Sequence, residues 1–295
     1  MTTRAPLRAA APRAIALTVA AMGAFAANSV LCRLALDDQL IDPASFAAVR
    51  VLTAAITLAL ILLPRWRARG WRRSSWHGAA AMLAYLITFS FAYRSLGAGT
   101  GALILFGAAQ LTMIGMALRQ GESFSLVGQC GFVLAIIGLT VLVAPGVSAP
   151  NPIGALMMGV AGLAWGVYSL LGRGAGDPLE ITANNFFYLV PAVIVLCVLF
   201  AGQRHWSMAG LALAAGSGSL ASGLGYVAWY EAQKYLSAIS AAAVQLSVPV
   251  IAALGGLALM SESITLRLML ASCATLGGIS IVLMRRAEPP AASVR

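Results

Sequence analysis

The stretch SVLCRLALD at residues 29–37 recurs as SLLGRGAGD at residues 169–177, 140 positions further along the chain. The two copies share a serine, a leucine, an arginine, an alanine and an aspartate at matching positions. The arginine and the aspartate are the informative matches, because chance alignment of an apolar chain would pair mostly Ala and Leu. We therefore interpret the chain as two copies of one structural unit.

The same offset aligns other regions of the two halves without a gap. The pairs are Phe25 with Trp165, Phe46 with Phe186, Arg94 with Lys234, Leu96 with Leu236, Ala98 with Ala238, Ala102 with Ala242, Glu122-Ser123 with Glu262-Ser263, Leu126 with Leu266, and Gly138 with Gly278.

The composition indicates a membrane protein. Hydrophobic residues make up 60% of the 295 residues and charged residues only 9%, against about 25% charged in an ordinary soluble domain. A soluble chain of this length could not remove so much apolar surface from water. The net charge of +10 comes from arginines in short loops, without the basic stripe of a nucleic-acid-binding face. We expect the lipid bilayer as a partner, and no nucleic acid.

A helix needs about 20 mostly apolar residues to cross a bilayer. The sequence predicts ten such spans, at 14–36, 44–63, 76–96, 98–118, 124–144, 152–172, 181–201, 207–231, 237–259 and 264–284. The loops between them carry helix breakers, namely Asp42-Pro43, Pro64, Pro145-Gly146, Pro150-Asn151-Pro152 and Asp177-Pro178. No stretch is left for a soluble domain.

The predicted fold is an all-α membrane protein of two inverted five-helix repeats. The repeats are 14–144 and 152–284, between tails at 1–13 and 285–295. Five is odd, so the second copy must enter the membrane from the opposite side. Inverted repeats suit alternating access, because the two halves can exchange local shapes to give two conformations of similar energy.

The positive charges predict the orientation. Of the 19 Lys and Arg residues, fourteen fall in loops or tails on the side of the N-terminus. Three fall on the other side, namely Arg33, Arg94 and Arg204. Because positive charge stays inside, both termini should be cytoplasmic, in a multi-pass protein of a bacterial inner membrane. The first span imitates a signal peptide, but its counterpart in the second repeat predicts that it is kept.

Ten helices, a 5 + 5 inverted repeat, short loops and a Glu-Ser pair opening the fifth helix of each half resemble the drug/metabolite transporter superfamily. Within it the chain is similar to the EamA-type exporters, over about residues 14–284. The aromatic second half, with Trp165, Tyr168, Tyr226, Trp229 and Tyr230, resembles the YddG-type amino-acid exporters. This likeness implies alternating-access export of small metabolites, with amino acids, aromatic or over a broad range, as the first expectation.

Polar and aromatic side chains within the spans are the candidate substrate-binding residues. Lipid penalises amides, so these side chains should face the bundle interior or a water-filled cavity. The set is Asn28, Tyr85, Phe89, Gln110, Trp165, Tyr168, Tyr226, Trp229, Tyr230 and Gln245. The amides could instead only join helices, and Tyr85 and Phe89 could face lipid. Trp229 lies about 100° around its helix from Tyr230, so it is the one expected to point elsewhere.

The charged residues near the spans have structural readings. Glu122 and Glu262 each precede the last helix of a repeat, where a carboxylate favourably meets the helix dipole. Because no Asp, Glu or His lies near the middle of a span, facilitated diffusion is favoured over proton antiport. Glu231, at the cytoplasmic end of its helix, is the nearest exception. Arg50 and Arg267 are expected to snorkel outward, so the site should hold no fixed charge and bind weakly.

Other classes of protein fit the sequence poorly. The four cysteines are singletons within apolar runs, unsuited to a zinc site or a disulfide framework. With only two histidines and no Walker A or zinc-binding motif, we expect no enzyme, no cofactor and no metal. The expected partners are a small-molecule substrate and lipid, for a monomer or weak homodimer. An exporter of another metabolite or drug, or a non-transporting receptor or assembly protein, stays an alternative.

Overall fold

The computed structural model describes residues 5–71, 75–121, 125–146, 148–172, 176–236 and 238–285. These residues are almost entirely helical. The elements are α1 Ala5–Asp37, α2 Pro43–Arg69, α3 Trp76–Ala92, α4 Ala98–Arg119, α5 Leu126–Val143, α6 Pro152–Leu171, α7 Pro178–Leu199, η1 Ala201–Gln203, α8 Met208–Gly216, η2 Ser217–Leu224, α9 Gly225–Gln233, α10 Ala238–Gln245, α11 Ser247–Met260 and α12 Leu266–Arg285.

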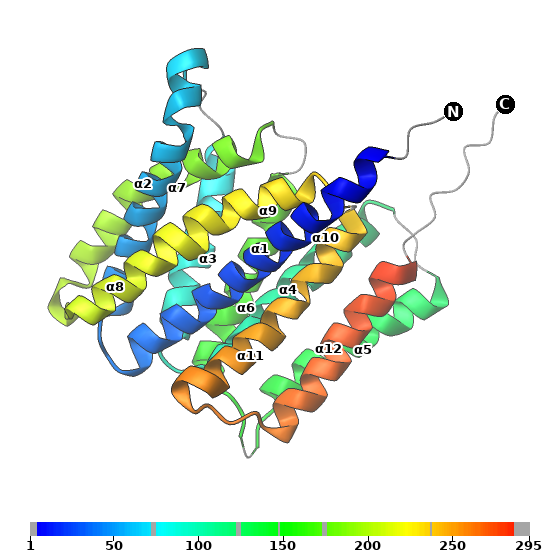
Figure 1. Cartoon of the computed structure of the whole chain (residues 1–295). Coiled ribbons are helices and arrows are strands. Elements are labelled where there is room, and N and C mark those ends of the chain that lie inside the picture. The colour runs from blue at the N-terminus through cyan, green and yellow to red at the C-terminus, as the bar shows by residue number, and fades with distance from the viewer. Residues whose placement is uncertain are drawn as a thin grey trace.

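The helices make ten passes through the bundle. Nine helices of the described ranges are long and apolar enough to cross a membrane, and α3 is a shorter apolar helix of 17 residues. The eighth pass joins α8, η2 and α9, and the ninth joins α10 and α11. The beginning of α1 and the end of α12 lie at one end of the bundle (Figure 1), which we call the terminal end.

Helix starts follow the breakers in the sequence. Asp42, Asn151 and Asp177 are the N-caps of α2, α6 and α7, and each side chain accepts a backbone N–H of the first turn. The proline that follows each cap suits the first helical position, because its missing N–H would be unpaired there anyway. Three of the predicted boundaries are thereby explained by capping chemistry.

Two boundaries differ most from the prediction. Pro64, expected in a loop, lies inside α2, which continues to Arg69. The turn beyond the proline is held by tertiary bonds, because Arg65 contacts Asp177 and Trp66 Nε1 donates to Glu180 at the start of α7. The predicted tail at 1–13 also differs, since α1 begins at Ala5.

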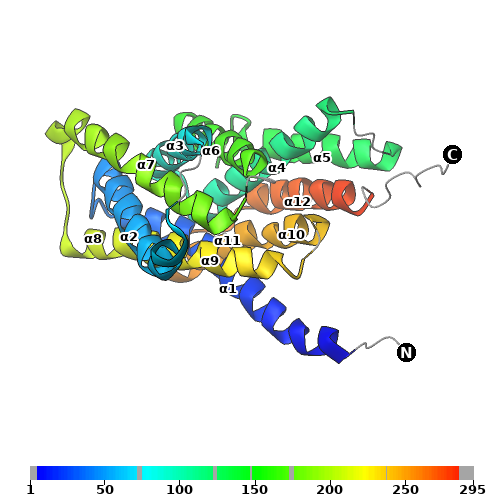
Figure 2. The ribbon, with the colours of Figure 1, turned by 90° about the horizontal axis from the view of Figure 1, so that it is seen from above.

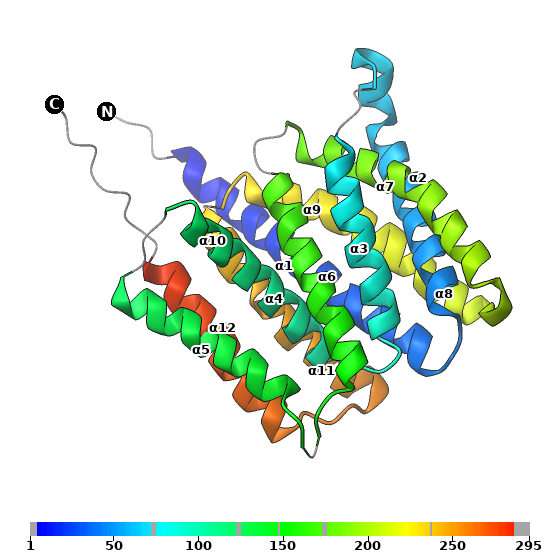
Figure 3. The ribbon, with the colours of Figure 1, turned by 180° about the vertical axis from the view of Figure 1, so that it is seen from behind.

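The passes form two layers, and each layer mixes the two halves of the chain. In one layer α3 packs between α6 and α7, and α4 packs on α6 (Figures 2 and 3). In the other, α8 and α9 pack on α1 and α2 flanks η2, while α1 also contacts α11. These contacts of one layer have repeat-related counterparts in the other. The interior therefore lies between the two layers, and both repeats line it.

The α5–α12 contact shows that the repeats are inverted. A Cβ on Gly131 would lie 2.7 Å from the Gly278 carbonyl oxygen, and one on Gly138 would lie 3.0 Å from the Ala271 carbonyl oxygen. Partner numbers fall along α12 as they rise along α5, so the two helices are antiparallel. The 140-residue offset relates Gly131 to Ala271 and Gly138 to Gly278, so the repeat maps the first of these contacts onto the second. The equivalent helices are thus related by a two-fold axis, as the repeat predicted.

Small residues form the seam at this contact, and apolar residues cover the outside. Gly128, Gly131, Ala135 and Gly138 are all buried on α5, and such small side chains let two helices approach closely. Leu126, Leu156, Leu199 and Met284 are each at least 70% exposed. Such side chains on an outer surface indicate contact with lipid.

Candidate substrate site between the two repeats

Aromatic rings fill the interior where the two repeats meet. The Tyr85 ring of α3 lies 5.0 Å from Trp165 of α6 and 5.3 Å from Phe89, measured between centroids. Trp165 lies 5.4 Å from Tyr168 and 5.9 Å from Tyr226. We call the connected set of rings the aromatic cluster. Its members are Phe25, Tyr85, Phe89, Tyr93, Trp165, Tyr168, Phe186, Tyr226, Trp229 and Tyr230.

The cluster contains every aromatic side chain of the predicted site. Tyr85 and Phe89 are only 5% and 1% exposed, so the alternative that they face lipid is wrong. Trp229, expected to point elsewhere, is also buried in the interior and lies 5.8 Å from Phe25. Sequence reasoning did not assign Phe25 to the site. The alignment of Phe25 with Trp165 in the repeat could have indicated that Phe25 belongs to the site.

Arg50 lies against the cluster, and its placement corrects the sequence analysis. The side chain was expected to snorkel outward, yet it is 0% exposed. Its guanidinium carbon lies 4.9 Å from the Phe89 ring centroid and 5.5 Å from that of Tyr85. Arg50 Nε donates to Ser222 Oγ at 3.2 Å and Nη2 to the Tyr85 hydroxyl at 3.0 Å. The interior therefore holds a fixed positive charge, contrary to the expectation.

The π-helical turn η2 brings polar groups to Arg50. Ser217 Oγ donates to Asn28 Oδ1 at 2.6 Å, and Asn28 Nδ2 donates to Ser222 Oγ at 3.3 Å. A Cβ on Gly218 would overlap Thr53 Oγ1 and the Arg50 carbonyl oxygen, so glycine is what allows η2 to approach α2. The predicted span 207–231 therefore contains a π-helical segment, a feature that occurs often at functional sites.

A second set of hydroxyls lies nearer the terminal end. Thr182 of α7 is hydrogen-bonded to Tyr168 at 2.9 Å and to Tyr230 at 2.8 Å. Tyr230 also stacks on Tyr226 with ring centroids 6.1 Å apart. Thr182 was absent from the predicted site because a lone threonine in a span usually bonds its own helix backbone. Here it links α6, α7 and α9.

The two glutamines of the predicted site occupy the α4–α10 region. Gln110 is buried and donates to the Ala242 carbonyl at 3.4 Å, so it joins α4 to α10. Gln245 is half-buried at the end of α10, next to the break before α11. No ring contact of the aromatic cluster involves this region in the described part of the chain.

Two cavities of unequal size lie at the ends of the bundle. At the terminal end a cavity of about 760 Å³ is lined by the end of α2, the start of α7 and Lys234. At the opposite end a cavity of about 100 Å³ lies between Leu96, Ser148 and Thr265. Tyr230 is one helical turn from Lys234, and Thr182 is two residues from Glu180. The aromatic cluster thus ends about one helical turn from residues that line the larger cavity.

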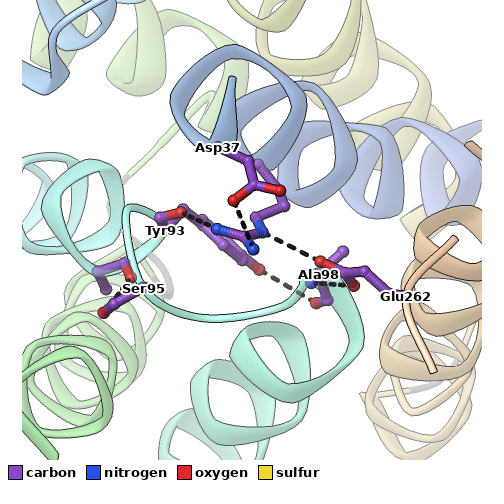
Figure 4. A network of polar contacts seen from close by, with 7 residues as sticks. Asp37, Tyr93, Ser95, Ala98 and Glu262 are labelled. Atoms are coloured by element: carbon purple, nitrogen blue, oxygen red, sulfur yellow. Dashed lines mark hydrogen bonds and ion pairs between the residues drawn. The ribbon is translucent and has the colours of Figure 1, made fainter. Parts of the chain in front are cut away.

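A charged network closes the opposite end (Figure 4). Arg33 of α1 pairs with Glu262 at 3.0 Å and with Asp37 at 2.8 Å. It also donates to the Tyr93 carbonyl at 3.2 Å, and Glu262 accepts the backbone N–H of Ala98 at 2.8 Å. We call these five residues the closing network. Tyr93 links it to the aromatic cluster, because its ring lies 4.8 Å from Phe89.

The charged residues near the spans have other partners than expected. Glu262 was expected to stabilise the start of its own helix, but its carboxylate meets the N-terminus of α4 instead. Glu122 lies outside the described residues. Arg267, expected to snorkel, donates to the Ala144 carbonyl at the end of α5. Glu231 pairs with Lys234 at the terminal end. The four cysteines are free.

Comparisons with known proteins give the family. The sequence model of the EamA-like transporter family matches residues 152–284, which is the second repeat. A protein of Pseudomonas aeruginosa whose name records no activity is 50% identical over 93% of this chain and 96% of its own length. A protein of Archaeoglobus fulgidus named "Uncharacterized transporter" is 25% identical over 84% of this chain and 91% of its own.

Two further similarities bear on function and fold. A protein of Streptantibioticus cattleyicolor named "Probable terminal-alkyne amino-acid exporter" is 28% identical over 71% of this chain and 73% of its own length. A crystal structure with 18% sequence identity superposes with a TM-score of 0.65 over 92% of this chain and 99% of that chain. At this identity the superposition establishes the shared fold.

A polytopic helical bundle of two inverted repeats, with a buried polar and aromatic region between them, defines a membrane transporter. The chain belongs to the EamA-like transporter family, within the drug/metabolite transporter superfamily.

Proposed function

We propose that this transporter exports small metabolites, amino acids first among them, by alternating access between its two repeats. One observation carries the proposal. The buried aromatic cluster between the repeats ends about one helical turn from Lys234, which lines a cavity of about 760 Å³, and contacts the closing network at its other end through Tyr93. A site closed on one side and approached from the other is what alternating access requires.

The chemistry of the cluster supports an amino acid with an apolar side chain. Such a substrate offers an apolar part to the faces of Trp165 and Tyr226, and two charged ends to polar groups. The hydroxyls of Tyr168, Thr182 and Tyr230 supply hydrogen bonds within the same region. The relative named as an amino-acid exporter supports the same substrate class. A cationic drug fits less well, because Arg50 repels a second cation.

The proposed orientation places both termini in the cytoplasm of a bacterial inner membrane. The larger cavity then faces the cytoplasm, where an exporter loads its substrate. Among the described residues, none of the aromatic cluster's polar partners is an acid, and proton relays in membranes use such groups. We therefore propose facilitated export down the substrate gradient, without proton antiport.

Counterflow in proteoliposomes tests the proposed function. Purified full-length protein is reconstituted in liposomes loaded with unlabelled L-phenylalanine and diluted into a trace of labelled L-phenylalanine. We expect the label to accumulate above the level of protein-free liposomes, and other apolar amino acids to compete. If none of the common amino acids produces counterflow or competes, the amino-acid assignment is wrong. Counterflow with a non-amino-acid metabolite would then support the alternative within the family.

A further inference from the structure

Arg50 is a buried cation without an anionic partner. It is fully buried, and its Nη1 has no hydrogen-bond acceptor among the described residues. None of the ion pairs of the described chain involves it. A charge removed from water without a counter-charge costs several kcal/mol of stability. An ionisable side chain retained inside a membrane bundle at such a cost points to function.

The neighbours of Arg50 add further free donors. Ser222 Oγ accepts from both Arg50 and Asn28, so the proton of its own hydroxyl is left to donate. The Tyr85 hydroxyl oxygen accepts from Arg50 Nη2 and can donate its proton in the same way. Three donors therefore converge around one positive charge. This arrangement needs an acceptor, and an anion is the acceptor that also cancels the charge.

We propose that Arg50, Ser222 and Tyr85 bind the carboxylate of the transported substrate. The inference rests on the proposed function and specifies its substrate class as small monocarboxylates with an apolar or aromatic tail. One carboxylate oxygen accepts Arg50 Nη1, and the second accepts a hydroxyl proton. The binding is non-covalent, and no bond is formed or broken.

The surroundings of the three donors fit the rest of such a substrate. Tyr85 joins the three donors to the aromatic cluster, because its hydroxyl accepts from Arg50 while its ring lies 5.0 Å from Trp165. A tail extending from the carboxylate therefore meets the faces of Trp165 and Tyr226. The Phe89 and Tyr85 rings beside the guanidinium hold it in place by cation–π attraction and exclude water. The carboxylate is thus the recognised group, and the ammonium is not required.

A purely structural role explains less of the geometry. As a cross-link between α2, α3 and η2, Arg50 would need only the two bonds made by Nε and Nη2. The free Nη1 and the missing counter-charge have no structural purpose. The structural role is nevertheless one outcome of the test.

Four related probes separate the carboxylate from the rest of the substrate. L-Phenylalanine and 3-phenylpropionate carry it, whereas L-phenylalaninamide and phenethylamine do not. Each is tested as a competitor of L-phenylalanine counterflow in proteoliposomes. We expect the two carboxylates to compete at least about tenfold better than the other two, the effect of one charge-assisted hydrogen bond. Arg50→Gln should abolish this preference. Folded Arg50→Gln protein with an unchanged preference would overturn the proposal.

Two further variants guard against misfolding. Ser222→Ala removes one donor and keeps the charge. Ser219→Ala is its matched control in the same π-helix, since the Ser219 hydroxyl donates to the Ala215 carbonyl of the same membrane pass. We expect Ser222→Ala to raise the apparent KM for L-phenylalanine roughly three- to tenfold and Ser219→Ala to leave it unchanged. Equal effects of the two variants would show that Arg50 and Ser222 are structural.

A binding measurement separates this inference from the proposed function. Thermal unfolding of detergent-purified protein is followed with increasing 3-phenylpropionate, and with phenethylamine as control. Stabilisation by 3-phenylpropionate and not by phenethylamine, weakened in Ser222→Ala, supports the carboxylate site even if no counterflow occurs. In that case the transport assignment alone fails. Counterflow without any preference for carboxylates would support the transporter assignment and overturn the proposed carboxylate site.

Discussion

The Glu262 carboxylate lies 3.0 Å from Nε of Arg33, although 229 residues separate the two in the chain. Arg33 is in the last turns of α1 and Glu262 precedes α12, so the pair joins the beginning of one repeat to the end of the other. The same carboxylate accepts the N–H of Ala98 at the start of α4. Three helices are thereby held together at the end opposite the termini, where the smaller cavity lies.

Breaking this pair should open the closed end of the bundle. Glu262→Gln removes the charge that Arg33 and the α4 N-terminus share, so conformations open at this end become more populated. A cysteine at Thr100, which lines the smaller cavity, should react roughly fivefold faster with a membrane-impermeant maleimide. The experiment uses protein whose native cysteines are replaced by serine.

Arg65→Gln provides the matched control for Glu262→Gln. It breaks the exposed pair with Asp177, whose side chains are 56% and 43% exposed, and exposed pairs contribute little. Labelling at position 100 should not change. An equal increase in both variants would mean that loss of any ion pair loosens the bundle.

Removing a ring from the aromatic cluster should change substrate preference. Trp165→Ala deletes a ring that contacts Tyr85, Tyr168 and Tyr226. Counterflow of large apolar amino acids should fall roughly tenfold, and that of small polar ones much less, because only the former stack on the ring. Tyr230→Ala should act in the same direction. Equal losses across substrates in folded protein would mean that the rings only support the structure.

The α5–α12 seam should tolerate alanine at one glycine and not at its neighbour. A Cβ on Gly278 would lie 2.6 Å from the Ala135 backbone nitrogen, and backbone atoms there cannot move aside. Gly278→Ala should lower stability by about 1–3 kcal/mol, seen as a lower Tm in detergent. Gly277→Ala meets nothing within 4 Å and should keep or raise the Tm. A lower Tm for both variants would argue against the close seam.

Cysteine labelling in intact cells should establish the orientation. A cysteine at Arg69, at the end of α2, should resist an impermeant maleimide, whereas one at Ala149, between α5 and α6, should react. The prediction follows from the excess of positive charge on the terminal side. Strong labelling at position 69 with none at 149 would reverse the orientation, and the larger cavity would then face outward.

Features that depend on local sequence were predictable. Span length, breaker residues and charge distribution are read from neighbouring residues, because a helix satisfies its own backbone hydrogen bonds within lipid. The 140-residue repeat added the inversion, since an odd number of spans per copy permits no other arrangement. The aromatic members of the predicted site came together because rings with polar tips favour a shared interior over lipid.

The role of each charge was decided by the tertiary structure alone. A snorkelling arginine and a buried one look the same in sequence. Arg50 is buried because the close contact of Gly218 with α2 brings Ser222, 172 residues away in the chain, within hydrogen-bond distance. Glu262 likewise precedes one helix but stabilises the start of another. The energy of a charge in a membrane protein depends on which dipoles and partners surround it. Those surroundings come from helices far apart in the chain, so no local pattern can specify them.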